Sequence, residues 1–354
     1  MGLEIKNKVL NYIFFSYLLS IIFYIFISYQ LYRLITIRNL VKQYDNLTAV
    51  DNLSLDIHDN EVFGLLGQNG AGKTTIIHML ATLLKPTSGT ASVNGYDIIN
   101  EPAKVRASIG IVFQAPSSDD MLTGYENLKL HSMLYSVPRK IREKRILEVL
   151  ELVGLTERKN DQVKKYSGGM RRRLEIARGI LHKPKILFLD EPTLGLDPRS
   201  RESMWEYIQR LVREEKITII LTTHYMEEAD ILCDRIGIID RGKIIALDTP
   251  SKLKEIVGGG DIIKLRLVDN KQDIDVLLKD LSFIHEIGID ANGSVILTVE
   301  EASRNLPIIL KRINVESVEF SNHNLNDVFI HFTAQNFREQ PEGGFMEKFA
   351  HYDK

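Results

Sequence analysis

The chain has 354 residues, more than one typical hydrophobic core holds, so two domains are expected. Its 45 Lys and Arg residues nearly balance 47 Asp and Glu residues, which argues against a protein that binds nucleic acid through bulk positive charge. The single cysteine, Cys233, excludes an internal disulfide and a cysteine-rich metal site, and it fits a reducing compartment.

The segment from Val9 to Tyr32 carries no charged residue and is rich in Ile, Leu, Phe and Tyr. As a helix it would rise about 36 Å, which is enough to cross a hydrocarbon layer of about 30 Å. Basic residues flank both ends, with a small excess after Tyr32, and this favours a cytosolic side for the chain that follows. Three interpretations stay open: an uncleaved membrane anchor, a start codon assigned too early, and a helix packed on a partner subunit.

Alternating apolar residues between positions 34 and 57 predict antiparallel strands at the edge of a domain. Leu53, Leu55 and Ile57 illustrate the alternation. The run Val62–Leu66 that follows is short and continuously apolar, so it is expected to be a buried strand.

A glycine-rich loop follows this strand, and Gly67–Thr74 fits the pattern G-x-x-x-x-G-K-[ST]. The loop consists of Gly67, Gln68, Asn69, Gly70, Ala71, Gly72, Lys73, Thr74 and Thr75. Apolar residues at helical spacing come next, from Ile76 to Leu84, so backbone N–H groups and the positive end of a helix point at one place. Lys73 supplies charge for the outer phosphates and the Thr74 hydroxyl can bind Mg²⁺, so the loop predicts a nucleotide site.

Residues 127–154 are predicted to be helical. Ile146, Val149, Leu150 and Val153 share one face, and Gly154 is a suitable C-cap.

A second helix start is predicted at Ser167, a natural N-cap, with an apolar stripe from Met170 to Leu181 behind it. Its small residues and free N–H groups form a second candidate anion site. One chain does not need two γ-phosphate sites for one nucleotide, whereas two chains arranged head to tail do, because each can close the other's site. A capped surface helix is the simpler alternative.

The apolar run Ile186–Leu189 predicts a strand covered on both faces, and it ends in Asp190 and Glu191. Because side chains alternate along a strand, we expect these carboxylates on opposite sides, with Asp190 toward Mg²⁺ and Glu191 toward the attacking water. A solvated acidic turn is the alternative for this segment alone.

Residues 261–333 show no catalytic cluster. Ile236–Leu247 is expected to fold back as a hairpin through Asp240-Arg241-Gly242, and Gly258–Gly260 is expected to be a flexible linker. Short strands and helices are expected at 262–268, 274–281, 294–299, 306–313 and 315–320, followed by a loose tail over 334–354.

These motifs, in this order, resemble the ATP-binding subunits of ABC transporters, in detail the daunorubicin-resistance type of the ABC-2 export systems. The resemblance covers about residues 34–257 and extends to a terminal motif at Asn324–Phe329. Met170 stands where the general signature has Gln, and Tyr166 where it has Leu. Both variants suit the drug-resistance subgroup.

The resemblance assigns roles to the residues that match. Tyr44 matches the aromatic residue that stacks on adenine, and Gln114 matches a glutamine that contacts Mg²⁺ and water and senses the membrane partner. The signature that binds ATP across a dimer matches Ser167, Gly168 and Gly169. The metal ligands match Thr74, Gln114 and Asp190. The catalytic residues match Glu191 as general base and His224 as switch histidine, and Gly195–Asp197 matches a loop that communicates between monomers.

The fold that the resemblance implies is an α/β P-loop NTPase. It has a RecA-like parallel sheet core, an antiparallel β subdomain and a helical subdomain, followed by a small C-terminal α+β domain with a regulatory or dimer-supporting role. The implied boundaries are 1–33 for the hydrophobic segment, 34–257 for the ATP-binding domain, 261–333 for the accessory domain and 334–354 for the tail.

The implied function is ATP hydrolysis, with ATP and Mg²⁺ as cofactors, by a homodimer at the cytoplasmic face of the cell membrane. The dimer would drive export of a drug, lipid or polysaccharide-like molecule through a separate ABC-2-type permease, and no nucleic acid is involved. The alternatives are a soluble ABC ATPase, an importer subunit and a nucleotide-binding scaffold without turnover. Glu191 and His224 together disfavour the scaffold.

Overall fold

The computed structural model describes residues 33–257, 261–268, 274–289, 293–321 and 324–338. The expectations for segments 9–32 and 258–260 fall outside these ranges. The chain divides into two compact units, Met1–His224 with Arg241–Lys243, and Tyr225–Asp240 with Ile244–Lys354. In the described part of the chain, no helix combines the length and apolar character that crossing a membrane would need.

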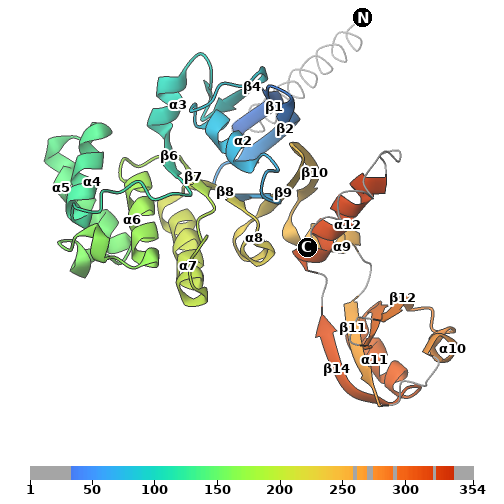
Figure 1. Ribbon diagram of the computed structural model, residues 1–354. Helices are drawn as coiled ribbons and strands as arrows, with labels where there is room; N and C mark the ends of the chain where they lie inside the picture. The colour runs from blue at the N-terminus through green and yellow to red at the C-terminus, as the bar shows by residue number, and fades with distance from the viewer. Residues whose placement is uncertain (1–32, 258–260, 269–273, 290–292, 322–323, 339–354) are drawn as a thin grey trace, which may run out of the picture. The chain divides into compact units, whose positions relative to one another are not determined.

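An antiparallel sheet opens the first unit, as the alternating pattern predicts (Figure 1). Its order is β2-β1-β4-β5. The strands are β1 (Arg33–Tyr44), β2 (Leu47–His58), β4 (Ser88–Val93) and β5 (Tyr96–Asp97). Ile35, Ile37 and Leu55 are buried on one face, so hydrophobic burial fixes the register of the sheet.

Four parallel strands form the core sheet of the first unit, in the order β3-β8-β7-β6. They are β3 (Val62–Leu66), β6 (Ile109–Val112), β7 (Ile186–Asp190) and β8 (Thr218–Thr223). The neighbours β3–β8, β8–β7 and β7–β6 are parallel. β3 and β7 are buried along their whole length, as the apolar runs predict. The carboxyl ends of four parallel strands therefore meet at one edge, where ligands of α/β sheets bind.

Helices complete the first unit. They are α2 (Lys73–Leu80), α3 (Pro102–Ser108), α4 (Gly124–Leu134), α5 (Arg139–Leu152), α6 (Gly168–Ile180) and α7 (Pro198–Glu215), with short 3₁₀ turns at Thr156–Arg158 and Val163–Lys165. α2 ends before Leu84 because Thr82 adopts a left-handed φ of 62°. α4, α5 and α6 contact one another and form a helical group (Figure 1).

The prediction that residues 127–154 are helical is confirmed by two helices, α4 and α5, which a short break separates. Ser136 has a φ of 55°, and Pro138 cannot continue a helix from the preceding turn. A capping box between Thr123 and Glu126 starts α4 before the predicted boundary. Gly154, with a φ of 61°, follows the end of α5 as predicted.

The second unit contains α8 (Met226–Leu232), β9 (Arg235–Asp240), most of β10 (Lys243–Asp248), α9 (Pro250–Val257) and α12 (Leu325–Arg338). β9 and β10 are neighbours, and the connecting Arg241 and Gly242 both have positive φ, as a two-residue hairpin turn requires. α12 contacts α8 and α9. It continues to Arg338, so the start of the expected loose tail is helical, because no Gly or Pro interrupts the chain before Pro341.

A four-stranded antiparallel sheet with two helices completes this unit. Its elements are β11 (Asp261–Leu267), α10 (Ile274–Leu278), β12 (Ile284–Ile289), β13 (Val295–Val299), α11 (Ala302–Leu310) and β14 (Val315–Ser321). The order β12-β13-β11-β14 and the β-α-β-β-α-β succession give a ferredoxin-like fold.

Two details of this sheet differ from the expectation. The strand β12 is missing from the prediction because it lies at the edge of the sheet and is only partly buried. α11 starts four residues earlier than predicted, and Pro307 lies inside it rather than at its start.

Candidate functional site

The glycine-rich loop connects β3 to α2 at the carboxyl edge of the core sheet. Gly70 and Gly72 have φ of 84° and 106°, and a Cβ on Gly72 would lie 2.3 Å from the carbonyl oxygen of Ala49. The tight turn therefore requires glycine at position 72. The Nζ of buried Lys73 donates to the carbonyls of Gly67 at 2.7 Å and Gln68 at 3.0 Å.

Burial lowers the pKa of Lys73, and the nearby carboxylates of Glu191 and Asp190 oppose this shift. The ammonium group is thus held in a desolvated position next to two carboxylates. In such a position a charge interacts more strongly with phosphate than it would in water.

Asp190 is buried at the end of β7, and its carboxylate accepts two hydroxyl groups. The Thr74 hydroxyl lies 3.0 and 3.1 Å from its two oxygens, and the Thr222 hydroxyl donates to Oδ1 at 2.5 Å. A carboxylate and a hydroxyl side by side are the hard oxygen ligands that Mg²⁺ takes together with phosphate oxygens and water. No group of three His, Cys, Asp or Glu side chains within the described ranges could hold a metal by itself. These residues therefore fit a magnesium ion shared with a nucleotide.

Glu191 leaves the strand instead of continuing it. Its φ of 47° is not that of an extended strand. The positions of the Asp190 and Glu191 carboxylates therefore do not result from the strand alternation that was expected. The backbone N–H of Glu191 donates to the Thr222 hydroxyl at 3.0 Å and lies 3.2 Å from the Thr222 carbonyl. Its Oε1 is 3.2 Å from Nδ1 of His224 and 3.8 Å from Nζ of Lys73.

Tyr44 and Gln114 are exposed at strand ends. Tyr44 is the last residue of β1 and is 43% exposed, and the Nζ of Lys42 lies 5.0 Å from the centre of its ring. Gln114 follows β6, whose neighbour in the sheet is β7, so it lies at the same edge as Asp190.

The predicted helix start at Ser167 is confirmed, because its hydroxyl accepts the N–H of Met170 at 3.3 Å. A cavity of about 180 Å³ lies beside it, lined by hydroxyl, arginine and small residues. The lining residues are Ser167, Gly169, Arg173, Arg199, Ser200, Ser203 and Met204. In the neighbouring loop Gly195 has a φ of 74° and Asp197 caps α7 through Ser200. Hydroxyl groups, two arginines and a helix N-terminus suit an anion.

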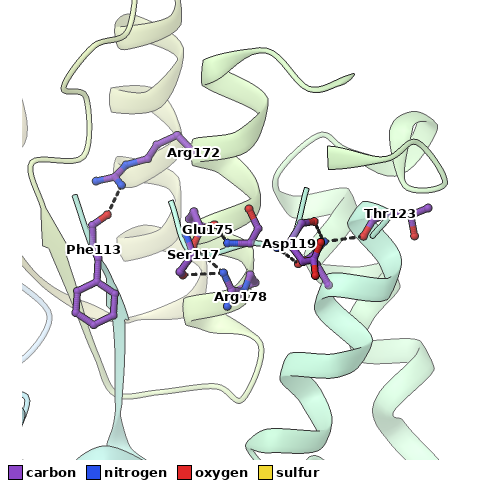
Figure 2. A network of polar contacts seen from close by, with 9 residues as sticks. Phe113, Ser117, Asp119, Thr123, Arg172, Glu175 and Arg178 are labelled. Carbon is purple, nitrogen blue, oxygen red and sulfur yellow. Dashed lines mark hydrogen bonds and ion pairs between the residues drawn. The ribbon is translucent and has the colours of Figure 1, made fainter. Parts of the chain in front are cut away.

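The sequence reasoning missed Arg172, Glu175 and Thr222. Arg172 and Glu175 lie on the buried face of α6 and bind the segment that follows β6 (Figure 2). The charged residues between the apolar positions of this helix were a signal for polar contacts, but they do not single out Arg172 from Arg171 and Arg173. For Thr222, the signal was a hydroxyl residue directly after the apolar run Ile219–Leu221, near the carboxyl end of its strand.

Residues 50–194 match the family model described as "ABC transporter". The chain is also 38% identical over 307 residues to the linearmycin resistance ATP-binding protein of Bacillus subtilis (strain 168), covering 85% of this chain and 98% of that protein. The chain belongs to the family of ABC transporter ATP-binding proteins.

Within this family the chain is of the daunorubicin-resistance type, as its motifs predict. It is 46% identical over 237 residues to the daunorubicin/doxorubicin resistance ATP-binding protein of Streptomyces peucetius, covering 67% of this chain and 71% of that protein. A dimeric ATP-binding cassette in a post-hydrolysis state, bound to ADP and Pi, matches with a TM-score of 0.55 and 28% identity over 61% of this chain and 98% of that chain. The predicted ABC ATPase fold is confirmed, and the chain is an ATP-binding transporter subunit with ATPase activity.

Proposed function

We propose that this ATPase works as a homodimer that closes on two ATP molecules and drives export through a separate ABC-2-type permease at the cytoplasmic face of the membrane. The main support for the proposal is that Lys73, Glu191 and His224 lie together at one edge of the core sheet. The signature at Ser167 lines a different cavity. The resistance functions in the names of both relatives support export.

ATP binds with its base against Tyr44 and its phosphates in the loop Gly67–Thr75. Thr74, Gln114 and Asp190 would hold Mg²⁺, which when bound offsets the charge of the β- and γ-phosphates. Lys73 turns from the loop carbonyls toward the outer phosphate oxygens.

Glu191 orients a water molecule and accepts its proton as the water oxygen bonds to the γ-phosphorus. The bond from that phosphorus to the β–γ bridging oxygen breaks, and ADP and inorganic phosphate result. His224, 3.2 Å from the Glu191 carboxylate, hydrogen-bonds the transferred phosphoryl group. Glu191 thus acts on the attacking water, and His224 acts on the phosphoryl group that is transferred to this water.

The second copy completes each site. Its Ser167, Gly168 and Gly169 present a helix N-terminus to the γ-phosphate, and the cavity beside Ser167 supports this role. Ser167 and Gly168 are exposed, so they are accessible to a nucleotide held by another chain. The dimeric cassette with ADP and Pi supports the same arrangement.

An apolar stripe on α4 is the proposed contact with the permease. Leu130, Met133 and Leu134 are 50%, 47% and 71% exposed and share one helix face at i, i+3 and i+4. α4 contacts the signature helix α6, so movement of α6 on dimer closure would reach the permease. The ATP-binding domain is proposed to span 34–257 and the accessory domain 261–333.

Co-purification with a co-expressed ABC-2-type permease from the same genome tests the proposal. The parent chain should co-purify with the permease. The Leu134→Glu variant should no longer co-purify with it but should still hydrolyse ATP. Glu206→Gln, an exposed change on α7, serves as the control. Equal capture of the Leu134→Glu variant would contradict this docking surface.

A further inference from the structure

We propose that Arg172 is a positioning residue for ATP hydrolysis, because its guanidinium ties the signature helix to the backbone of Glu191 and to the segment that leads into Gln114. The inference rests on the proposed role of Glu191 as general base and adds the group that holds this base in place.

The Arg172 guanidinium donates to backbone carbonyls of two separate loops. Nε donates to Pro192 at 2.8 Å, and Nη2 lies 2.8 Å from the carbonyl oxygen of Asp190 and 3.0 Å from that of Glu191. Nη1 donates to the carbonyl of Phe113 at 2.5 Å (Figure 2). The residue is only 7% exposed. One side chain on α6 thus links the ends of β6 and β7.

This set of contacts needs the shape of arginine. The guanidinium presents five N–H donors in a fixed planar fork, whereas a lysine ammonium is a compact point charge with three donors. The carbonyls of Phe113 and Pro192 lie on different loops and are bound by different nitrogens of Arg172. A lysine in this position would keep the charge but could not bridge the two loops in the same geometry.

The backbone of Glu191 is held from both sides of its residue. Its φ of 47° is a left-handed conformation that a non-glycine residue keeps only where its surroundings fix it. Thr222 binds the N–H of Glu191, and Arg172 binds its carbonyl. Without Arg172 the residue is free to return toward ordinary φ, which would move the carboxylate away from His224.

The same contact couples the general base to the signature. Arg172 lies on the helix that Ser167 caps, so the signature and the Glu191 backbone are fastened to one rigid element. Glu175, one turn further, accepts the N–H groups of Ser117 and Ser118 at 3.1 and 2.7 Å. α6 therefore also holds the segment after Gln114, and binding of the signature to a second copy's ATP would be transmitted to the base.

The test compares Arg172→Lys and Arg172→Ala with the parent chain in steady-state ATP hydrolysis and in equilibrium ATP binding. Because a displacement of about 1 Å can slow an enzyme roughly 100-fold, we expect kcat to fall about 10- to 100-fold. ATP affinity should change by less than about two-fold, because the phosphate loop is untouched. Added guanidinium ion should restore part of kcat in Arg172→Ala and none in Arg172→Lys.

Arg145→Lys is the matched control for the loss of a buried arginine. Arg145 is 6% exposed, and its guanidinium donates to the carbonyls of Leu181 at 3.1 Å and Ile180 at 3.0 Å, at the other end of α6. This control should lower the thermal unfolding temperature about as much as Arg172→Lys does, yet keep kcat. Arg172→Gln provides a second replacement should Arg172→Ala not fold, and its kcat should fall in the same range.

Parent-like kcat in a folded Arg172→Lys or Arg172→Gln variant would overturn the inference, provided that Glu191→Gln is inactive. An equal kcat loss in Arg145→Lys would also overturn it, because the effect would then be general destabilisation. Parent-like turnover in Glu191→Gln would instead remove the proposed role of Glu191 itself.

Discussion

The carboxylate of Glu191 lies 3.2 Å from the imidazole of His224, although the two residues follow the ends of different strands of the core sheet. β7 and β8 are parallel neighbours, so their carboxyl ends bring both residues to the same edge. Lys73 reaches the same carboxylate at 3.8 Å from the phosphate loop. The topology of the sheet thereby brings three loops together around the position proposed for the γ-phosphate.

Lys73→Ala should weaken ATP binding, because it removes the buried ammonium group that is proposed to bind the outer phosphates. A hydrogen bond to a charged group contributes about 1.5–3 kcal/mol, so we expect a loss of affinity of at least about ten-fold. Isothermal titration calorimetry measures this directly. Lys243→Ala, an exposed lysine paired with Asp51, is the control, and unchanged affinity in Lys73→Ala would count against the phosphate loop.

Gly72→Ala should abolish ATP binding or destabilise the loop, because its Cβ would lie 2.3 Å from the carbonyl oxygen of Ala49. Gly95→Ala tests the backbone effect alone, since Gly95 also has positive φ, 78°, but open space around it. A left-handed conformation costs a non-glycine residue about 1–2 kcal/mol, which sets the loss expected at Gly95. Chemical denaturation and ATP titration of both variants give the comparison, and equal effects would contradict the close approach to Ala49.

Thr222→Val should lower stability by about 1.5–3 kcal/mol, because the hydroxyl that donates to the buried Asp190 carboxylate is lost without a change of shape. kcat should fall as well, since the same hydroxyl holds the N–H of Glu191. Thr222→Ser keeps the hydroxyl and should stay near the parent in both measurements. Urea unfolding with steady-state hydrolysis checks this, and parent-like behaviour of Thr222→Val would contradict it.

The helical group should lose stability in mild acid through His131. Burial, together with the charges of Arg178 and His182, lowers the pKa of His131 to about 4, while Glu175 opposes the shift. Burial also lowers the pKa of His182, whose ring joins His131 through a stack with Tyr135.

In the unfolded chain His131 takes up a proton near its ordinary pKa of 6.5, whereas in the folded chain it does so only near pH 4. Protonation of His131 therefore favours the unfolded state as the pH falls through this window. Neutral His131 therefore contributes up to about 3 kcal/mol to the free energy of unfolding above pH 6.5, and this contribution is lost by about pH 4. His131→Gln should flatten the dependence of the unfolding free energy on pH over this range. An unchanged slope would contradict the assignment.

The sequence predicts best the elements that are determined by residues adjacent in the chain. Gly67–Thr75 carries the turn, the helix start and the proposed phosphate ligands in one stretch, and Ile186–Leu189 is recognisable as part of a buried strand by its continuous apolar character. The break between α4 and α5 is harder to predict, because the apolar spacing continues across Ser136 and Pro138.

Contacts that depend on helix rotation could not be predicted. Arg171, Arg172 and Arg173 are consecutive, and only the packing of α6 decides which one turns inward. The left-handed φ of Glu191 likewise depends on Thr222 and Arg172, which are distant in sequence. The strand β12 lies at a sheet edge, where partial burial weakens the alternating pattern.

The most direct test of the account is the molar mass of Glu191→Gln in solution, measured by light scattering with ATP and Mg²⁺, with ADP, and without nucleotide. Removal of a general base slows turnover about 10²- to 10⁴-fold, so the variant should hold ATP unhydrolysed. We predict a stable dimer with one ATP per chain in the first condition only, and a monomer for Lys73→Ala in all three. A chain that stays monomeric in every condition while the parent hydrolyses ATP at full rate would contradict the account.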